Sequence, residues 1–148
     1  MQIALRPNHP SQARVLLADD DLELRSLLSS ELQRVGYAVT EVASGTDLLD
    51  RLASDLIESA QPQFDLLVSD VRMPGWSGLE VLRGLRRAGL RLPVVLITAF
   101  GDPKSHRTAD RLGAVLLDKP FDLDDFRDAV AAELSQARSA TDGRAPSG

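Results

Sequence analysis

The sequence predicts an α/β fold in which five parallel strands alternate with five helices. Five short apolar segments recur at fairly even spacing along the 148 residues. Runs such as LLV and VVLI are continuously apolar, which is typical of parallel strands covered on both faces. The stretches between them carry apolar residues at helical spacing. Right-handed crossovers between such strands give an open sheet with helices on both sides.

Each expected element has its own signal. The predicted strands, in order, are Val15–Ala18, Tyr37–Val42, Phe64–Ser69, Pro93–Thr98 and Ala114–Leu117. Four intervening segments carry an apolar helical face, marked by Leu24, Leu28 and Leu32, by Leu48, Leu52 and Leu56, by Leu79, Leu82 and Leu85, and by Leu123, Phe126 and Val130. The remaining helix, after Pro103, is short and polar.

Helix boundaries are marked by capping residues. Ser77 and Glu80 form a capping-box pattern, and Asp102 precedes a proline suited to the first helical position. Three glycines follow helical segments as expected terminators: Gly36, Gly89 and Gly113. We therefore expect one domain over residues 14–135. Residues 1–13 are expected to be a disordered or extended tail, and residues 136–148, rich in Ala, Ser, Gly and Pro, a disordered one.

Composition excludes several classes of protein. The chain has no cysteine, which excludes disulfides and thiolate metal sites. No apolar run approaches the ~20 residues that span a membrane, and the first residues are too polar for a signal peptide, so a cytoplasmic protein without membrane partners is expected. The net charge of −5 is a poor match for nucleic acid and suits a protein partner or a bound cation.

Polar residues stand where the predicted strands end. The first strand ends in Asp19-Asp20-Asp21, the third in Asp70, the fourth in Thr98 and the fifth in Asp118-Lys119-Pro120. In open α/β sheets, ligands bind outside the carboxyl ends of the strands. These side chains are therefore expected to meet at one edge of the sheet.

Such a group of residues favours phosphoryl transfer. Two carboxylates ~4 Å apart repel by about 4 kcal/mol at an effective dielectric constant of ~20, so Asp19, Asp20 and Asp70 would shift their pKa values or recruit a cation. Oxygen ligands with a partly open shell suit Mg²⁺, which also binds phosphate oxygens. Lys119 adds a positive charge and Thr98 a hydroxyl, and a carboxylate such as Asp70 can form an aspartyl-phosphate. Taken alone, each of these residues is more simply explained as a turn, strand or surface residue. Only their joint occurrence at the strand ends indicates a phosphoryl-transfer site.

Four segments together resemble the receiver domain of bacterial two-component response regulators, of the stand-alone, chemotaxis-regulator type. They are VLLADDD, DLLVSDVRMPGWSGLEVL, PVVLITAFGD and LLDKPFD. The resemblance covers roughly residues 14–135 and implies a doubly wound, flavodoxin-like fold with the strand order 2-1-3-4-5.

The resemblance also implies roles for individual residues. Asp70 would be the phosphoacceptor. Asp19 and Asp20 would hold Mg²⁺ directly or through water, with Asp20 the one expected to bind the ion directly, and the backbone carbonyl of Arg72 would complete the protein ligands.

Two further residues would contact the phosphoryl group itself. Thr98 would donate a hydrogen bond to it and Lys119 would pair with one of its oxygens. The bond between Lys119 and Pro120 is expected to be cis.

The implied function is that of a single-domain regulator. It would take a phosphoryl group from a sensor histidine kinase or His-phosphotransfer protein, catalyse only its own phosphorylation and dephosphorylation, and signal to an unidentified protein target as a monomer or a phosphorylation-linked dimer. Three alternatives remain: a relay intermediate or phosphate sink, a passive scaffold, and a Mg²⁺-dependent phosphohydrolase. Hydrolases of that type usually carry a second Asp two residues after the nucleophile, where this chain has Arg72.

Three local features depart from the pattern or stand outside it. Leu116 occupies the position, three residues before Lys119, where such domains usually carry Tyr or Phe. The stretch from Ser54 to Gln63 is longer than usual, which suggests an extended second helix or a loop away from the site. Trp76 is expected to be a partly exposed loop residue.

Overall fold

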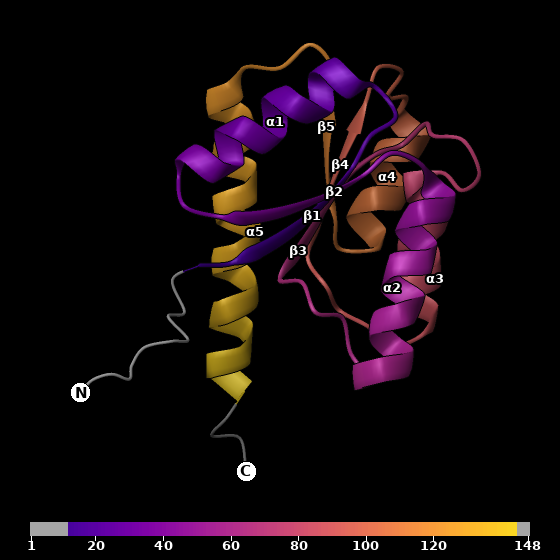
Figure 1. Cartoon of the computed structure of the whole chain (residues 1–148), viewed down its shortest axis with the longest axis vertical. Helices are drawn as coiled ribbons and strands as arrows, with labels where there is room; N and C mark the ends of the chain where they lie inside the picture. The colour runs from indigo at the N-terminus through magenta and orange to yellow at the C-terminus, as the bar shows by residue number, and fades with distance from the viewer. Residues whose placement is uncertain (1–11, 145–148) are drawn as a thin grey trace.

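Five parallel strands form one sheet in the order β2-β1-β3-β4-β5 (Figure 1). The structure is a computed structural model and describes residues 12–144. The strands are β1 (Arg14–Ala18), β2 (Ala38–Val42), β3 (Leu66–Asp70), β4 (Val94–Thr98) and β5 (Val115–Asp118). The helices are α1 (Leu22–Arg34), α2 (Gly45–Ser59), α3 (Gly78–Arg87), α4 (Pro103–Arg111) and α5 (Leu123–Arg144). The predicted fold class and strand order are confirmed.

Helices cover both faces of this sheet. α1 and α5 pack on one face, and α2, α3 and α4 on the other (Figure 1). Along β1, Leu16 belongs to the core under α2 and α3, whereas Val15 and Leu17 belong to the core under α1 and α5. Because both faces are buried, the strands are apolar throughout instead of alternating.

The predicted helix boundaries are largely confirmed. Ser77 accepts a hydrogen bond from the Glu80 backbone, and the Glu80 side chain accepts one from the Ser77 backbone, which completes the capping box. Asp102 accepts from the Ser105 backbone at 2.7 Å before Pro103. α2 extends to Ser59, which accounts for the long stretch noted in the sequence.

The C-terminal region differs from the prediction. Residues 136–144, expected to be disordered, continue α5 to Arg144. Gln136, Ala137 and Arg138 are good helix formers, and the first proline after them is Pro146. Residues 1–11 and 145–148, predicted as parts of the tails, lie outside the described residues. Within residues 12–144, no helix combines the length and the apolar composition that crossing a membrane requires.

One arginine fixes the sheet edge at which β4 and β5 begin. The Arg86 side chain, at the end of α3, donates from Nε to the carbonyl of Leu112 at 2.7 Å. Its Nη1 donates to the carbonyls of Leu90 and Leu92, each at 2.9 Å. One guanidinium therefore joins the loops that precede β4 and β5.

Candidate functional site

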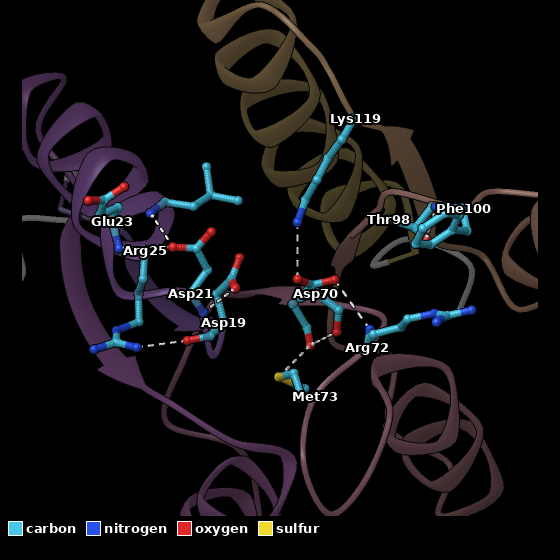
Figure 2. A network of polar contacts seen from close by, with 12 residues as sticks. Asp19, Asp21, Glu23, Arg25, Asp70, Arg72, Met73, Thr98, Phe100 and Lys119 are labelled. Carbon is cyan, nitrogen blue, oxygen red and sulfur yellow. Dashed lines mark hydrogen bonds and ion pairs between the residues drawn. The ribbon is translucent and has the colours of Figure 1, made fainter.

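The strand register brings the predicted site residues to one edge of the sheet. Ala18, just before Asp19, pairs with Ser69, just before Asp70. Asp70 in turn pairs with Ile97, next to Thr98. Figure 2 shows the Lys119 amine above the Asp70 carboxylate and Asp19 to its left. Residues from the ends of three other strands thus lie around the Asp70 carboxylate.

Three carboxylates form the acidic part of the site. Ligand oxygens of Asp19, Asp20 and Asp70 all lie within 4.8 Å of one another. Asp19 and Asp70 are buried, with 1% and 7% of their surfaces exposed, while Asp20 is open to solvent. One side of the cluster is therefore accessible and the other is enclosed by protein.

Asp19 has a buried carboxylate oxygen that lacks a hydrogen-bond partner among the described residues. Its Oδ1 accepts from the backbone N–H of Asp21 at 2.9 Å, but among the described residues its buried Oδ2 has no hydrogen-bond partner. Burial raises the pKa of Asp19 from its usual 3.8 to about 6, and the nearby charge of Asp70 acts in the same direction. A buried, unpaired carboxylate oxygen within a group of oxygen ligands fits a hard divalent cation such as Mg²⁺.

Lys119 provides the positive charge at the site. Its Nζ lies 3.2 Å from Asp70 Oδ2, and the two side chains are 26% and 9% exposed. The backbone N–H of Lys119 donates to the Thr98 carbonyl at 2.7 Å, which fixes the start of its side chain beside β4. The peptide bond to Pro120 is cis, as expected.

Thr98 and Arg72 lie on the side of Asp70 away from Asp19 (Figure 2). Thr98 is buried, and its hydroxyl oxygen accepts from the Phe100 backbone at 3.1 Å. Residues 12–144 contain no hydrogen bond between Thr98 and Asp70. The backbone N–H of Arg72 donates to Asp70 Oδ1 at 3.2 Å, and its guanidinium lies 4.8 Å from the centre of the Phe100 ring.

Two residues that support the site were not identified from the sequence. Arg25 donates from Nη1 to the Asp19 carbonyl at 2.8 Å and pairs with Glu41 at 3.0 Å, so it ties the ends of β1 and β2 to α1. A Cβ at Gly78 would lie 2.6 Å from the Asp70 carbonyl oxygen, so only glycine lets α3 start this close to Asp70. The Ser77-Gly78 pair at the start of α3 could have indicated Gly78; no local pattern indicates Arg25.

Two further residues lie on or beside β5. Leu116 is half-buried in the strand, at the position noted for its missing aromatic ring. His106 of α4 lies with Nε2 2.9 Å from Asp118 Oδ2. Both side chains are about half exposed, at 41% and 52%.

Comparison with known protein families identifies the domain. The family described as the response regulator receiver domain matches residues 15–131. Sporulation initiation phosphotransferase F of Bacillus subtilis is 31% identical over 122 residues, which cover 82% of this chain and 93% of that protein. Response regulator protein PmrA of Pseudomonas aeruginosa is 38% identical over 125 residues, or 80% of this chain and 51% of that protein. The chain thus spans about half the length of that regulator.

Solved structures give the same assignment. Response regulator TrrA of Thermotoga maritima, in complex with Mg²⁺-BeF, is 29% identical, with a TM-score of 0.69 over 82% of this chain and 99% of that one. Chemotaxis response regulator CheY4 of Vibrio cholerae is 27% identical, with a TM-score of 0.68 over 82% of this chain and 98% of that one. Fold, acidic pocket and sequence therefore agree, and the chain belongs to the response regulator receiver domain family of two-component signalling.

Proposed function

We propose that Asp70 accepts a phosphoryl group from a histidine kinase or a His-phosphotransfer protein. The observation that carries this proposal is the convergence on Asp70 of Lys119, at 3.2 Å, and of two further carboxylates whose oxygens lie within 4.8 Å. An oxygen of the Asp70 carboxylate forms the new bond to phosphorus while the phosphorus–nitrogen bond of the donor's phosphohistidine breaks. The released imidazole nitrogen takes up a proton from solvent, which balances the transfer.

Lys119 and Thr98 are placed to stabilise the transferred group. The Lys119 ammonium already faces one Asp70 oxygen and would pair with a phosphoryl oxygen, whose negative charge it offsets. The Thr98 hydroxyl accepts from the Phe100 backbone, which leaves its own proton available for donation to the phosphoryl group. Phosphoryl transfer depends mainly on such positioning and charge neutralisation.

Asp19, Asp20, Asp70 and the backbone carbonyl of Arg72 would hold Mg²⁺. When bound, the ion neutralises the negative charge shared by the carboxylates and the incoming phosphoryl oxygens. The buried Oδ2 of Asp19, unpaired among the described residues, supports this assignment because a cation would satisfy it.

The output that we propose is a phosphorylation-dependent contact with another protein, made by a stand-alone regulator that turns over no separate substrate. Arg72 stands two residues after Asp70, where a phosphohydrolase would carry its general acid. A second candidate is a relay intermediate that passes the phosphoryl group on. The similarity to a protein named sporulation initiation phosphotransferase F, of which the matched region covers 93%, favours this candidate.

The phosphoacceptor is tested by labelling the full chain with a small acyl phosphate and Mg²⁺. Mass spectrometry should find one phosphoryl group on the peptide that contains Asp70. Asp70→Asn should abolish the label, and Lys119→Gln should slow labelling by at least about tenfold. The control Asp128→Asn, at an exposed position of α5, should label like the wild type. Label on another residue, or none while a known receiver domain is labelled in parallel, would overturn the proposal.

The two outputs differ in what happens to the label. A relay intermediate returns the phosphoryl group quickly to a His-phosphotransfer protein. A regulator retains it and binds its target more tightly when Asp70 is phosphorylated. Single-turnover transfer and binding measured with the same labelled sample therefore separate them.

A further inference from the structure

An apolar groove lies between α2 and α3, on the face of the sheet away from α1 and α5. It has a volume of about 280 Å³, and its walls include Leu49 and Leu56 of α2, Val81 and Gly84 of α3, and Trp76. A Cβ placed on Gly84 would meet nothing within 4 Å, so the groove is open where the two helices face each other. An open apolar hollow can receive an apolar side chain from another molecule.

The same face carries an exposed apolar side chain. Ile57, in the last turns of α2, is 84% exposed, the largest value among the exposed large hydrophobic residues of the described chain. It follows Ala53, a groove residue, by one helical turn and so stands at the rim. Trp76, at the opposite end of the groove, is 45% exposed. One face therefore holds both a projecting side chain and a hollow.

The two rims of the groove carry opposite charges. The outer row of α2 includes Asp50, and the outer row of α3 includes Arg83 and Arg87; all three are exposed. The one acidic residue of the α3 rim, Glu80, is engaged in the capping box at the start of the helix. A molecule that crosses the groove thus meets one acidic and one basic side.

These features point to a second copy of this chain, and we propose that two copies pair through the α2–α3 face. α2 and α3 begin at the same level, because the N–H of Gly45 donates to the Pro74 carbonyl at 2.9 Å, and each leads away from the strand ends (Figure 1). A two-fold axis through the groove places α2 of one copy antiparallel to α3 of the other. Ile57 then meets the Trp76 end of the partner's groove, and Asp50 comes opposite Arg83 and Arg87.

The apolar contact of Ile57 and the charge pairing of Asp50 each occur twice in such a pair, since a two-fold interface uses the same surface on each copy. This self-complementarity favours a second copy over an unrelated helix, which would need its own apolar side chain and its own paired charges. The inference goes beyond the proposed function. The interface uses helix surfaces, leaves the Asp70 edge open and requires no phosphoryl group.

Sedimentation velocity of the unphosphorylated full chain over a dilution series tests the pairing. We expect a reversible monomer–dimer equilibrium. Ile57→Asp should raise the dissociation constant at least about tenfold. The matched control is Leu27→Asp, on α1 across the sheet, where the native side chain is 50% exposed; it should leave the equilibrium unchanged.

Variants that reverse the charges on the two rims provide a second test of the pairing. The double variant Arg83→Glu with Arg87→Glu should weaken the dimer, and adding Asp50→Lys should restore it. A monomer at every concentration would overturn the proposal. A dimer that is insensitive to Ile57→Asp would overturn it as well. Since no phosphoryl donor is present, neither result bears on Asp70 as the phosphoacceptor.

Discussion

Replacing Asp19 by asparagine should stabilise the metal-free protein at neutral pH. The side chain is buried beside Asp70, and burial raises its pKa from 3.8 to about 6. At about 1.4 kcal/mol per pH unit, this displacement sets an upper limit of about 3 kcal/mol on the destabilisation caused by ionised Asp19. Asparagine keeps the shape and the acceptor for the Asp21 backbone but carries no charge, so we expect a gain of about 2 kcal/mol, or roughly 4–8 °C in Tm.

The raised pKa also predicts how the stability difference between the wild type and Asp19→Asn changes with pH. Because the folded-state pKa is the higher one, the folded protein holds the proton more tightly than the unfolded chain between about pH 4 and pH 6. The stability of the wild type relative to Asp19→Asn therefore falls as the pH rises through this range, and stays at its lower value above pH ~6. Mg²⁺ should reverse the order at neutral pH, because it stabilises the wild type and binds the variant poorly.

Thermal unfolding followed by circular dichroism, with chelator and then with Mg²⁺, measures both effects. Asp128→Asn serves as the control, since it removes one carboxylate from an exposed position and should change neither curve. The reasoning would be refuted if metal-free Asp19→Asn melted at or below the wild-type temperature at neutral pH. It would also be refuted if the difference between the two proteins were the same on both sides of the pH range.

Three further substitutions test the elements that hold the site in place, each by urea unfolding. Ser77→Ala removes the capping box of α3 and should cost about 1 kcal/mol. Gly78→Ala places a Cβ 2.6 Å from the Asp70 carbonyl oxygen; it should cost about 2 kcal/mol and also slow labelling by acyl phosphate, so an unchanged labelling rate would contradict this account. Arg86→Met leaves three loop carbonyls without their donor and should cost about 3 kcal/mol, whereas Arg107→Met at an exposed position of α4 should cost less than about 0.5 kcal/mol.

The sequence was sufficient for the parts of the site that follow from strand order. Continuous apolar runs locate the strands, and in a parallel sheet every strand ends at the same edge, so Asp19, Asp70 and Lys119 are expected at that edge. The strand order that brings them near one another is implied by the resemblance to receiver domains. The 3.2 Å contact between Lys119 and Asp70 bears out that geometric expectation.

Other features could not be predicted because they depend on side-chain packing between distant segments. Arg25 donates a hydrogen bond to the Asp19 carbonyl, and Arg86 donates to carbonyls of two loops. No sequence pattern links either arginine to its acceptors. The α2–α3 groove arises from the spacing between two helices, which local periodicity does not encode. The helical continuation to Arg144 was missed because Ala- and Ser-rich composition suggested disorder, although most of these residues tolerate a helix.

The placement of Arg86 has a consequence for how the sheet can deform. Its guanidinium holds the starts of β4 and β5 at a fixed spacing, so sliding of one strand past the other is opposed there. At the far ends of the same strands, the Lys119 backbone N–H donates to the Thr98 carbonyl at 2.7 Å. The Arg86 contacts therefore oppose sliding at the edge opposite to the one where Thr98 and Lys119 stand.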